Sequence, residues 1–345
     1  MKRNPYTLTF GKEPAESISR PLQLNEIIDT FRADRPSQQI YMISGVRGAG
    51  KTVFMSELSS YFQKEEDWVV TELNPNKNML EELASHLSNE HTIAQIFKNA
   101  KINLSFWNFG IEFNTGMQLT DIDTALYNML EALQKKQKKL LITIDEVISS
   151  ENMHIFASTY QIMLRKNLPV FLLMTGLYEN INQLQNEKSL TFLYRAPKIT
   201  LKPLNLGSIA SNYKSVFNLD QNTSRDMAAL TLGYPFAFQV LGYMTWKYNG
   251  NYKDALSEYR QYLEEYVYEK IWSELSPKDR QVAYAIAKCS NDTIKDIREI
   301  LDMQTNEFNP YRKRLLRKGI INGESRGHVH FTLPLFDEFV LDNYF

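Results

Sequence analysis

A glycine-rich stretch carries the clearest chemistry in the chain, with the spacing G-x-x-x-x-G-K-T in Gly45-Val46-Arg47-Gly48-Ala49-Gly50-Lys51-Thr52. Glycines let backbone N–H groups close on phosphate oxygens without a Cβ in the way. Lys51 is expected to bridge the β- and γ-phosphates, and the Thr52 hydroxyl is expected to hold Mg²⁺. We therefore expect the stretch from Gly45 to Val53 to bind the phosphate chain of a nucleoside triphosphate.

An acidic pair, Asp145-Glu146, follows an apolar stretch at 140–144 that has the composition of a core strand. Ligands of parallel α/β sheets bind outside the carboxyl ends of strands, so the pair is expected at the ligand-binding edge. Asp145 is suited to hold Mg²⁺ through its water shell, opposite Thr52. Glu146 is suited to orient and deprotonate the attacking water. The pair predicts hydrolysis in addition to binding.

Two further side chains lie at predicted strand boundaries. Thr175 ends the next strand, where its hydroxyl either hydrogen-bonds the lytic water or the γ-phosphate, or only satisfies backbone groups. Arg195 precedes the last strand, where a guanidinium either stabilises charge on the transferring phosphoryl group or is a plain surface arginine. The expected catalytic residues are thus Glu146, Lys51, Arg195 and Thr175, and the expected metal ligands are Thr52 and Asp145.

The elements that must position these residues alternate between strands and helices. Apolar and β-branched stretches predict five strands, at 39–44, 68–73, 140–144, 170–174 and 198–201. Helical spacing follows the glycine loop and recurs at 77–100, 120–136 and 151–166. This alternation predicts an α/β fold, a parallel sheet with helices on both faces. Residues 102–113 predict a β-hairpin whose aromatic side chains are either core or a partner surface (Phe106, Trp107, Phe109, Phe113).

The pattern changes twice after the last predicted strand. Residues 205–271 are helical throughout, which predicts an all-α lid. From Ser276 onward, three short helices at 278–289, 293–302 and about 305–318 precede a small β-hairpin, which describes a winged helix-turn-helix. The predicted domains are a nucleotide-binding α/β domain at 1–203, a helical lid at 204–273 and a winged-helix domain at 274–345.

The third helix of the tail, at 305–318, has two possible partners. Its basic side chains occupy one arc and its apolar side chains the other; the basic ones are Arg312, Lys313, Arg314, Arg317 and Lys318. Pro310 is tolerable only near the start of a helix, which puts the basic half in the later turns. The arc is suited to DNA phosphates, yet acidic and basic residues nearly balance over the whole tail. Contact with a protein or with the rest of the chain is therefore the favoured interpretation.

The overall composition is that of a globular protein. The chain has 345 residues, 43% hydrophobic and 23% charged, and a net charge of −1, so no global basic field indicates nucleic acid or membrane binding. One cysteine, Cys289, excludes a disulfide framework, and its apolar surroundings favour a packing role. No apolar signal segment or membrane-length run is present. We expect a soluble cytoplasmic protein with no membrane association.

These motifs together resemble those of AAA+ ATPases, within them the STAND-like and archaeal-type branch that carries a C-terminal winged helix. The resemblance covers nearly the whole chain and rests on the stretches at 45–52, 145–146, 194–195 and 233–235, and on the tail segments at 275–277, 317–321 and 336–339. Asn4-Pro5-Tyr6, Phe10-Gly11 and Ser19-Arg20 resemble that branch's N-terminal segment near the adenine. The resemblance implies a five-stranded sheet and a helical lid with the nucleotide between them. It also implies that Arg20, Tyr234 and Pro235 lie against that nucleotide.

The function predicted from these observations is an ATP-binding molecular switch with slow, Mg²⁺-dependent ATP hydrolysis. Its expected ligands are ATP or ADP and Mg²⁺, with a protein partner. The rival is an ATP-regulated DNA-binding protein or loader that uses the helix at 305–318. A kinase or GTPase that shares only the glycine loop is disfavoured, because no guanine-recognition stretch Asn-Lys-x-Asp occurs in the sequence.

Overall fold

The computed structural model describes residues 3–9, 14–89, 96, 122–323 and 325–344. The predicted hairpin at 102–113 lies outside the described residues. The chain divides into two compact units, which we call the sheet unit and the helical unit. The sheet unit comprises residues 21–44 and 54–200; the helical unit comprises residues 1–20, 45–53 and 201–345.

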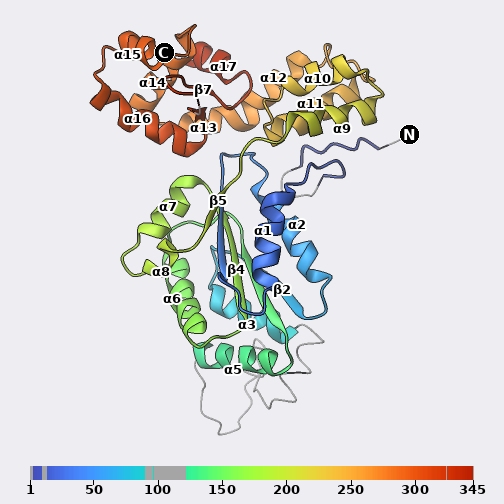
Figure 1. Ribbon diagram of the computed structural model, residues 1–345, viewed down its shortest axis with the longest axis vertical. Coiled ribbons are helices and arrows are strands. Elements are labelled where there is room, and N and C mark those ends of the chain that lie inside the picture. The colour runs from blue at the N-terminus through green and yellow to red at the C-terminus, as the bar shows by residue number, and fades with distance from the viewer. Residues whose placement is uncertain (1–2, 10–13, 90–95, 97–121, 324, 345) are drawn as a thin grey trace. The chain divides into compact units, whose positions relative to one another are not determined.

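The sheet unit is built on five parallel strands in the order β2-β3-β4-β1-β5 (Figure 1). The strands are β1 Ile40–Ser44, β2 Trp68–Leu73, β3 Lys139–Ile144, β4 Val170–Gly176 and β5 Lys198–Thr200. Every residue of β1 and β4 is buried, which explains why their sequences are almost wholly apolar instead of alternating. The predicted parallel α/β sheet is confirmed.

Helices cover both faces of this sheet (Figure 1). On one face, Phe31 contacts Phe171 with ring centroids 4.9 Å apart, and Phe62 contacts Trp68 at 4.3 Å. These rings join α1 Pro21–Arg32 and α2 Lys51–Gln63 to the sheet. Strand residues of the opposite parity, such as Met42 of β1, pack on the other face. There they meet α3 Met79–Asn89, α5 Ile122–Lys135, α6 Glu151–Arg165 and α7 Tyr178–Asn186; the short α8 is Thr191–Tyr194.

Three central strands end at the same edge of the sheet. Ser44, the last residue of β1, pairs with Gly176 of β4, and Ile144, the last residue of β3, pairs with Met174. Because the strands are parallel, the chain leaves all three at their carboxyl ends on one side. Asp145 follows β3 directly, and the glycine loop follows β1 directly.

The helical unit contains the predicted all-α region and the N-terminal segment. Its helices are α9 Leu206–Phe217, α10 Gln221–Ala229, α11 Pro235–Lys247, α12 Leu256–Leu263, a π-helical turn Glu264–Tyr268 and α13 Glu269–Ser273. Tyr6 stacks on Phe217 with centroids 5.8 Å apart, and its hydroxyl bonds the Asn212 side chain at 2.6 Å. The N-terminal segment therefore contributes to the core of these helices.

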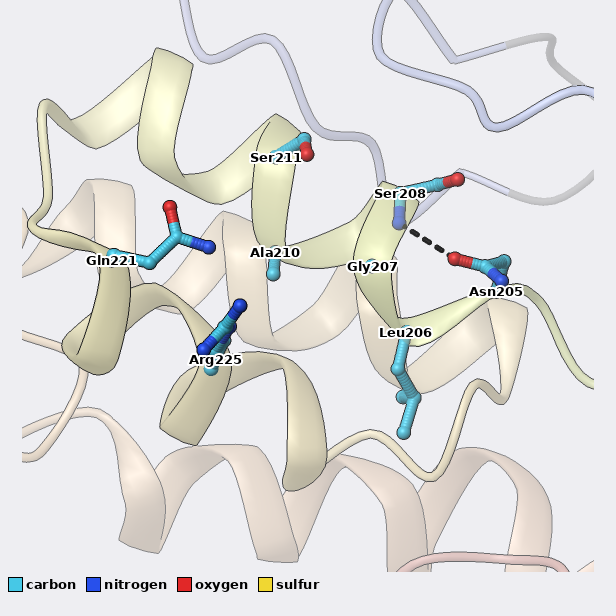
Figure 2. A pocket seen from close by; sticks show the side chains of 8 residues that line it. All are labelled: Asn205, Leu206, Gly207, Ser208, Ala210, Ser211, Gln221 and Arg225. Atoms are coloured by element: carbon cyan, nitrogen blue, oxygen red, sulfur yellow. Dashed lines mark hydrogen bonds between the residues drawn. The ribbon is translucent and has the colours of Figure 1, made fainter.

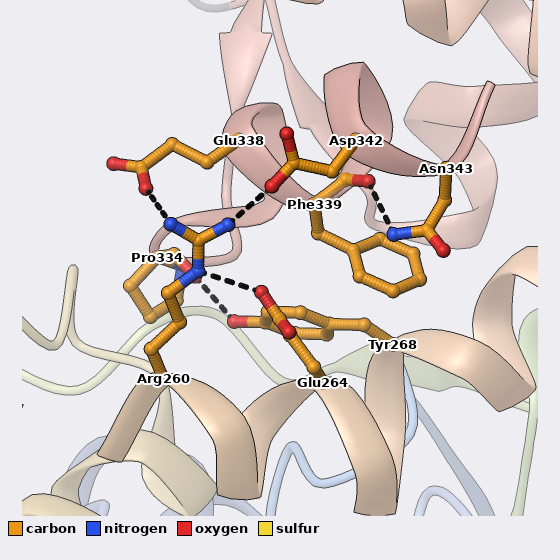
Figure 3. Close-up of polar contacts among 8 residues, drawn as sticks. All are labelled: Arg260, Glu264, Tyr268, Pro334, Glu338, Phe339, Asp342 and Asn343. Atoms are coloured by element: carbon orange, nitrogen blue, oxygen red, sulfur yellow. Dashed lines mark hydrogen bonds and ion pairs between the residues drawn. The ribbon is translucent and has the colours of Figure 1, made fainter. Parts of the chain in front are cut away.

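The C-terminal part of the helical unit has three helices and a small antiparallel pair in the predicted order. They are α14 Pro277–Lys288, α15 Ile294–Leu301, α16 Thr305–Lys318, β6 Ile321–Asn322 and β7 His330–Phe331. A final helix, α17 Phe336–Asn343, was not placed by the sequence pattern. Arg260 of α12 bonds Glu338 and Asp342 of α17 at 2.7 and 2.6 Å (Figure 3). This clamp ties α17 to the helices that precede it.

Two expectations from composition concern Cys289 and the helices. Cys289 is buried at the end of α14 in the apolar core of the helical unit, in agreement with a packing role. Among the helices of the described residues, none is both long and apolar enough to cross a membrane.

Candidate functional site

The glycine loop has the backbone geometry that its sequence demands. Gly48 and Gly50 have φ angles of 74° and 81°, in the left-handed region that side chains with a Cβ rarely adopt. The loop then runs into α2, which begins at Lys51 as predicted. The first N–H groups of a 13-residue helix have no intrahelical partner, and its dipole favours an anion at this end. The loop therefore fits a phosphate group.

Lys51 hydrogen-bonds the backbone of the loop. Its ammonium group donates to the carbonyl oxygens of Gly45 at 3.2 Å and Val46 at 3.1 Å. The ammonium thus lies over the loop where a polyphosphate chain would need a counter-charge.

Residues from elsewhere in the helical unit contact the loop backbone. The Tyr234 hydroxyl donates to the Arg47 carbonyl at 2.6 Å, and a Cβ built on Gly50 would lie 3.7 Å from the Pro235 side chain. Arg20 donates to the carbonyl oxygens of Lys202 at 2.5 Å and Ala49 at 3.4 Å. Burial lowers the pKa of Arg20 to about 10, so its guanidinium remains charged at neutral pH. The structure brings together Arg20, Tyr234, Pro235 and the loop.

The C-terminal part of the helical unit also contacts the loop. Arg47 forms an ion pair with Glu274, the C-cap residue of α13, at 3.2 Å. A Cβ built on Gly319, the C-cap of α16, would lie 3.6 Å from the Cβ of Val46. The sequence pattern did not predict these contacts, because nothing in the spacing of Glu274 or Gly319 links them to the loop.

The acidic pair forms a hydrogen-bonded turn with Thr175 in the sheet unit. The Thr175 hydroxyl donates to the Asp145 carboxylate and accepts from the Glu146 N–H at 3.3 Å. The Glu146 N–H also donates to Asp145 Oδ1 at 2.9 Å. Glu146 has a φ of 52°, an uncommon backbone conformation for a residue with a side chain, so these bonds hold a strained turn. β3 and β4 are neighbours in the sheet, so the predicted adjacency of the Thr175 and Asp145 strands is confirmed.

Arg195 lies where the sequence placed it, between α8 and β5. It is the exposed C-cap residue of α8, and its guanidinium makes no hydrogen bond or ion pair with the described residues. Tyr194 beside it is also exposed. The geometry is compatible with either sequence-based interpretation of Arg195.

The side chains assigned to Mg²⁺ have the right donor chemistry. Thr52 and Asp145 supply oxygen atoms, which Mg²⁺ prefers, and the bonds from Thr175 and Glu146 orient the Asp145 carboxylate. Within the described ranges, no group of three or more His, Cys, Asp or Glu side chains could hold a metal ion.

The basic arc of α16 is not a single free surface, which corrects the sequence-based description. Arg314 forms an ion pair at 2.9 Å with Asp279 of α14, whose side chain is only 2% exposed. The Nε atom of Arg312 is buried. Pro310 lies inside α16, past its first turn, instead of near its start. Fewer cations than predicted are therefore available to DNA.

A separate hollow of about 790 Å³ lies between α9 and α10 (Figure 2). Gln221 and Arg225 line one side and the N-terminal turn of α9 the other. Asn205 caps that turn by accepting from the Ser208 N–H at 3.0 Å. None of the predicted site residues lines this hollow.

Comparisons with known proteins agree with this geometry. Residues 17–171 match the family model of the AAA ATPase domain, and residues 265–340 match that of a domain of unknown function, DUF8462. No match to a curated protein was found. A Walker-type ATPase of Pyrococcus abyssi is similar in structure, with a TM-score of 0.63, 16% identity and coverage of 94% of this chain and 95% of that chain.

Two further solved structures are similar to the chain. The ORC2 protein of Aeropyrum pernix, in ADPNP–ADP complexes, has a TM-score of 0.55 and 14% identity, with coverage of 93% of this chain and 90% of that chain. A signal transduction ATPase with numerous domains from Pyrococcus horikoshii has a TM-score of 0.40 and 15% identity, with coverage of 96% and 44%. The likeness to the first two structures extends the shared fold over nearly the whole chain. The chain therefore contains an AAA ATPase domain, at residues 17–171.

Proposed function

We propose that the protein is a nucleotide-controlled switch that binds ATP with Mg²⁺ and hydrolyses it slowly. The observation that carries the proposal is the set of contacts on the glycine loop. Tyr234 of the helical lid and Glu274 at the end of α13 both bond Arg47 of the loop. A ligand that alters the conformation of the loop would therefore alter the contacts of Tyr234 and of Glu274 with Arg47.

In this proposal, the backbone N–H groups of residues 45–53 and the Lys51 ammonium bind the phosphate chain. Thr52 and Asp145 would hold Mg²⁺, which supplies charge neutralisation on the phosphate oxygens. Glu146 orients the attacking water and accepts its proton, while Thr175 holds the turn that carries Glu146. Arg195 stabilises charge on the transferring phosphoryl group. The adenine nucleotide is favoured because the Aeropyrum pernix ORC2 protein was solved in ADPNP–ADP complexes.

The proposed domain division follows the order of the elements. Residues 1–203 carry the sheet, the glycine loop and the acidic pair, residues 204–273 form the helical lid, and residues 274–345 form the winged helix with β6 and β7 as its wing. The proposed output is a protein partner or contact within the chain. We do not extend the proposal to DNA, because Arg314 of the basic arc is bonded to the buried Asp279.

The test uses Glu146→Gln, which removes the proposed base and keeps the shape of the side chain. We expect ATP affinity to be retained and turnover to fall at least about 100-fold, the usual contribution of a general base. Hydrogen exchange across residues 206–344 should differ between the ATP- and ADP-bound variant. The matched control is Glu151→Gln, an exposed residue at the start of α6 that should leave turnover unchanged.

Normal turnover in the Glu146→Gln protein would contradict the assigned base. Identical exchange patterns with ATP and ADP would contradict the switch while leaving the ATPase activity unaffected.

Fluorescence anisotropy with duplex DNA over a range of salt concentrations tests the rival function, DNA binding. If the protein binds DNA tightly and in a salt-dependent way, and Lys313→Gln and Arg317→Gln weaken that binding, the DNA-binding function is supported instead.

A further inference from the structure

Tyr234 contacts the glycine loop through its hydroxyl end. The side chain is only 3% exposed, and its hydroxyl donates to the Arg47 carbonyl at 2.6 Å. Burial raises the pKa of Tyr234 well above the usual value for tyrosine. The hydroxyl is therefore protonated, and able to donate, at neutral pH.

This one bond sets the direction of a neighbouring N–H group. The peptide between Arg47 and Gly48 is trans, like every other described peptide bond, so its C=O and N–H groups point in opposite directions. With the carbonyl turned toward Tyr234, the Gly48 N–H is turned away from it. No acceptor among the described residues bonds this N–H group. It belongs to the stretch whose amides are expected to bind phosphate.

Gly48 and Tyr234 also fit one another sterically. A Cβ built on Gly48 would lie 2.2 Å from the Tyr234 hydroxyl oxygen, much closer than contact distance. Gly48 has a φ of 74° as well. The backbone conformation and the tyrosine therefore both require glycine at position 48. Tyr234 can approach the loop this closely only because Gly48 has no Cβ.

We propose that Tyr234 is a positioning residue for phosphate binding: its hydroxyl fixes the Arg47–Gly48 peptide so that the Gly48 N–H faces the phosphate chain. The residue acts through the loop backbone and does not touch the nucleotide, which differs from the direct nucleotide contact implied by the sequence resemblance. The inference rests on the proposed function. Tyr234 is also the N-cap of α11, so its bond links a helix of the lid to the peptide that receives the phosphate.

The test compares Tyr234→Phe with Tyr213→Phe. Phenylalanine keeps the ring and removes only the hydroxyl. Tyr213 is a matched control, since it is fully buried in the same unit and its hydroxyl also donates to a backbone carbonyl, that of Phe238, at 2.8 Å. Calorimetric titration with ATP and with inorganic tripolyphosphate, both with Mg²⁺, measures affinity. Chemical denaturation without ligand measures the stability of each variant.

We expect Tyr234→Phe to bind ATP and tripolyphosphate about 10-fold more weakly, the loss that one misdirected buried hydrogen bond produces. Tyr213→Phe should lose comparable stability and bind both ligands as wild type does. Unchanged affinity in Tyr234→Phe, or an equal loss in both variants, would overturn the positioning role. A wild-type protein that binds neither ligand would instead overturn the proposed function, and the inference with it.

Discussion

Arg47 Nη2 lies 3.2 Å from Glu274 Oε1, so the third residue of the glycine loop is ion-paired with the C-cap of α13. Both side chains are about one-third exposed, at 33% and 34%. The Nε atom of Arg47 is buried without a hydrogen-bond partner among the described residues, so Glu274 is its main charge partner. We expect a phosphate chain bound in the loop to compete with this carboxylate for the same guanidinium.

Removing the Glu274 charge should strengthen nucleotide binding. Glu274→Gln takes away an anion next to the loop and frees Arg47 for phosphate. Because partly exposed ion pairs contribute only about 0.2–1 kcal/mol, we expect ATP affinity to rise about 1.4- to fivefold. Glu269→Gln is the control, since it removes the same charge from an exposed residue of α13. We expect it to change ATP affinity only as far as the lower net negative charge does. Equal affinities for Glu274→Gln and wild type in a calorimetric titration would refute the competition.

Removing the Thr175 hydroxyl should slow hydrolysis more than it weakens binding. Thr175→Val keeps the shape of the fully buried side chain but loses the bonds to Asp145 and to the Glu146 N–H. With the strained turn released, we expect the single-turnover hydrolysis rate to fall about 10-fold, the equivalent of one hydrogen bond. Thr175→Ser retains the hydroxyl and should recover most of the rate. An equal rate in the valine and serine variants would assign Thr175 a packing role only.

Removing the charge of Arg314 should lower the free energy of unfolding, whereas the same change at an exposed neighbour on α16 should not. Asp279 is almost fully buried, and its carboxylate bonds Arg314 at 2.9 Å and Ser276 at 2.7 Å. Arg314→Gln removes the charge partner of Asp279, so we expect a loss of about 1–3 kcal/mol in the free energy of unfolding. Lys313→Gln, an exposed change on the same helix, should stay within about 0.5 kcal/mol of wild type. Urea denaturation of both variants measures the difference, and equal stabilities would show that the ion pair contributes nothing.

Local sequence patterns were sufficient to predict the strands of the sheet and the residues that follow them. The glycine loop, Asp145 and the five strands are each specified by a short stretch whose spacing or apolar character determines its conformation. Thr175 could be placed beside Asp145 because consecutive strands of a parallel sheet are usually neighbours. The three tail helices were found for the same reason, since each has apolar residues at helical spacing.

Contacts between distant residues could not be predicted in this way. Tyr234 and Arg47 are 187 positions apart, and Arg47 and Glu274 are 227 apart, so no periodicity relates them. The basic arc of α16 shows the same limit. Helical spacing places Arg314 on the same arc as Lys318, but only the packing of α14 against α16 determines that Arg314 meets Asp279.

The most direct test of the account is calorimetric titration of ATP with Mg²⁺ into wild type and Lys51→Ala. We predict saturable binding to wild type and binding about 100-fold weaker to Lys51→Ala, because a charge-assisted contact to the phosphate chain is lost. Thermal unfolding without nucleotide should be similar for the two proteins and serves as the control for folding. Equal ATP affinity in the two proteins would contradict the assignment of residues 45–53 as the phosphate-binding loop.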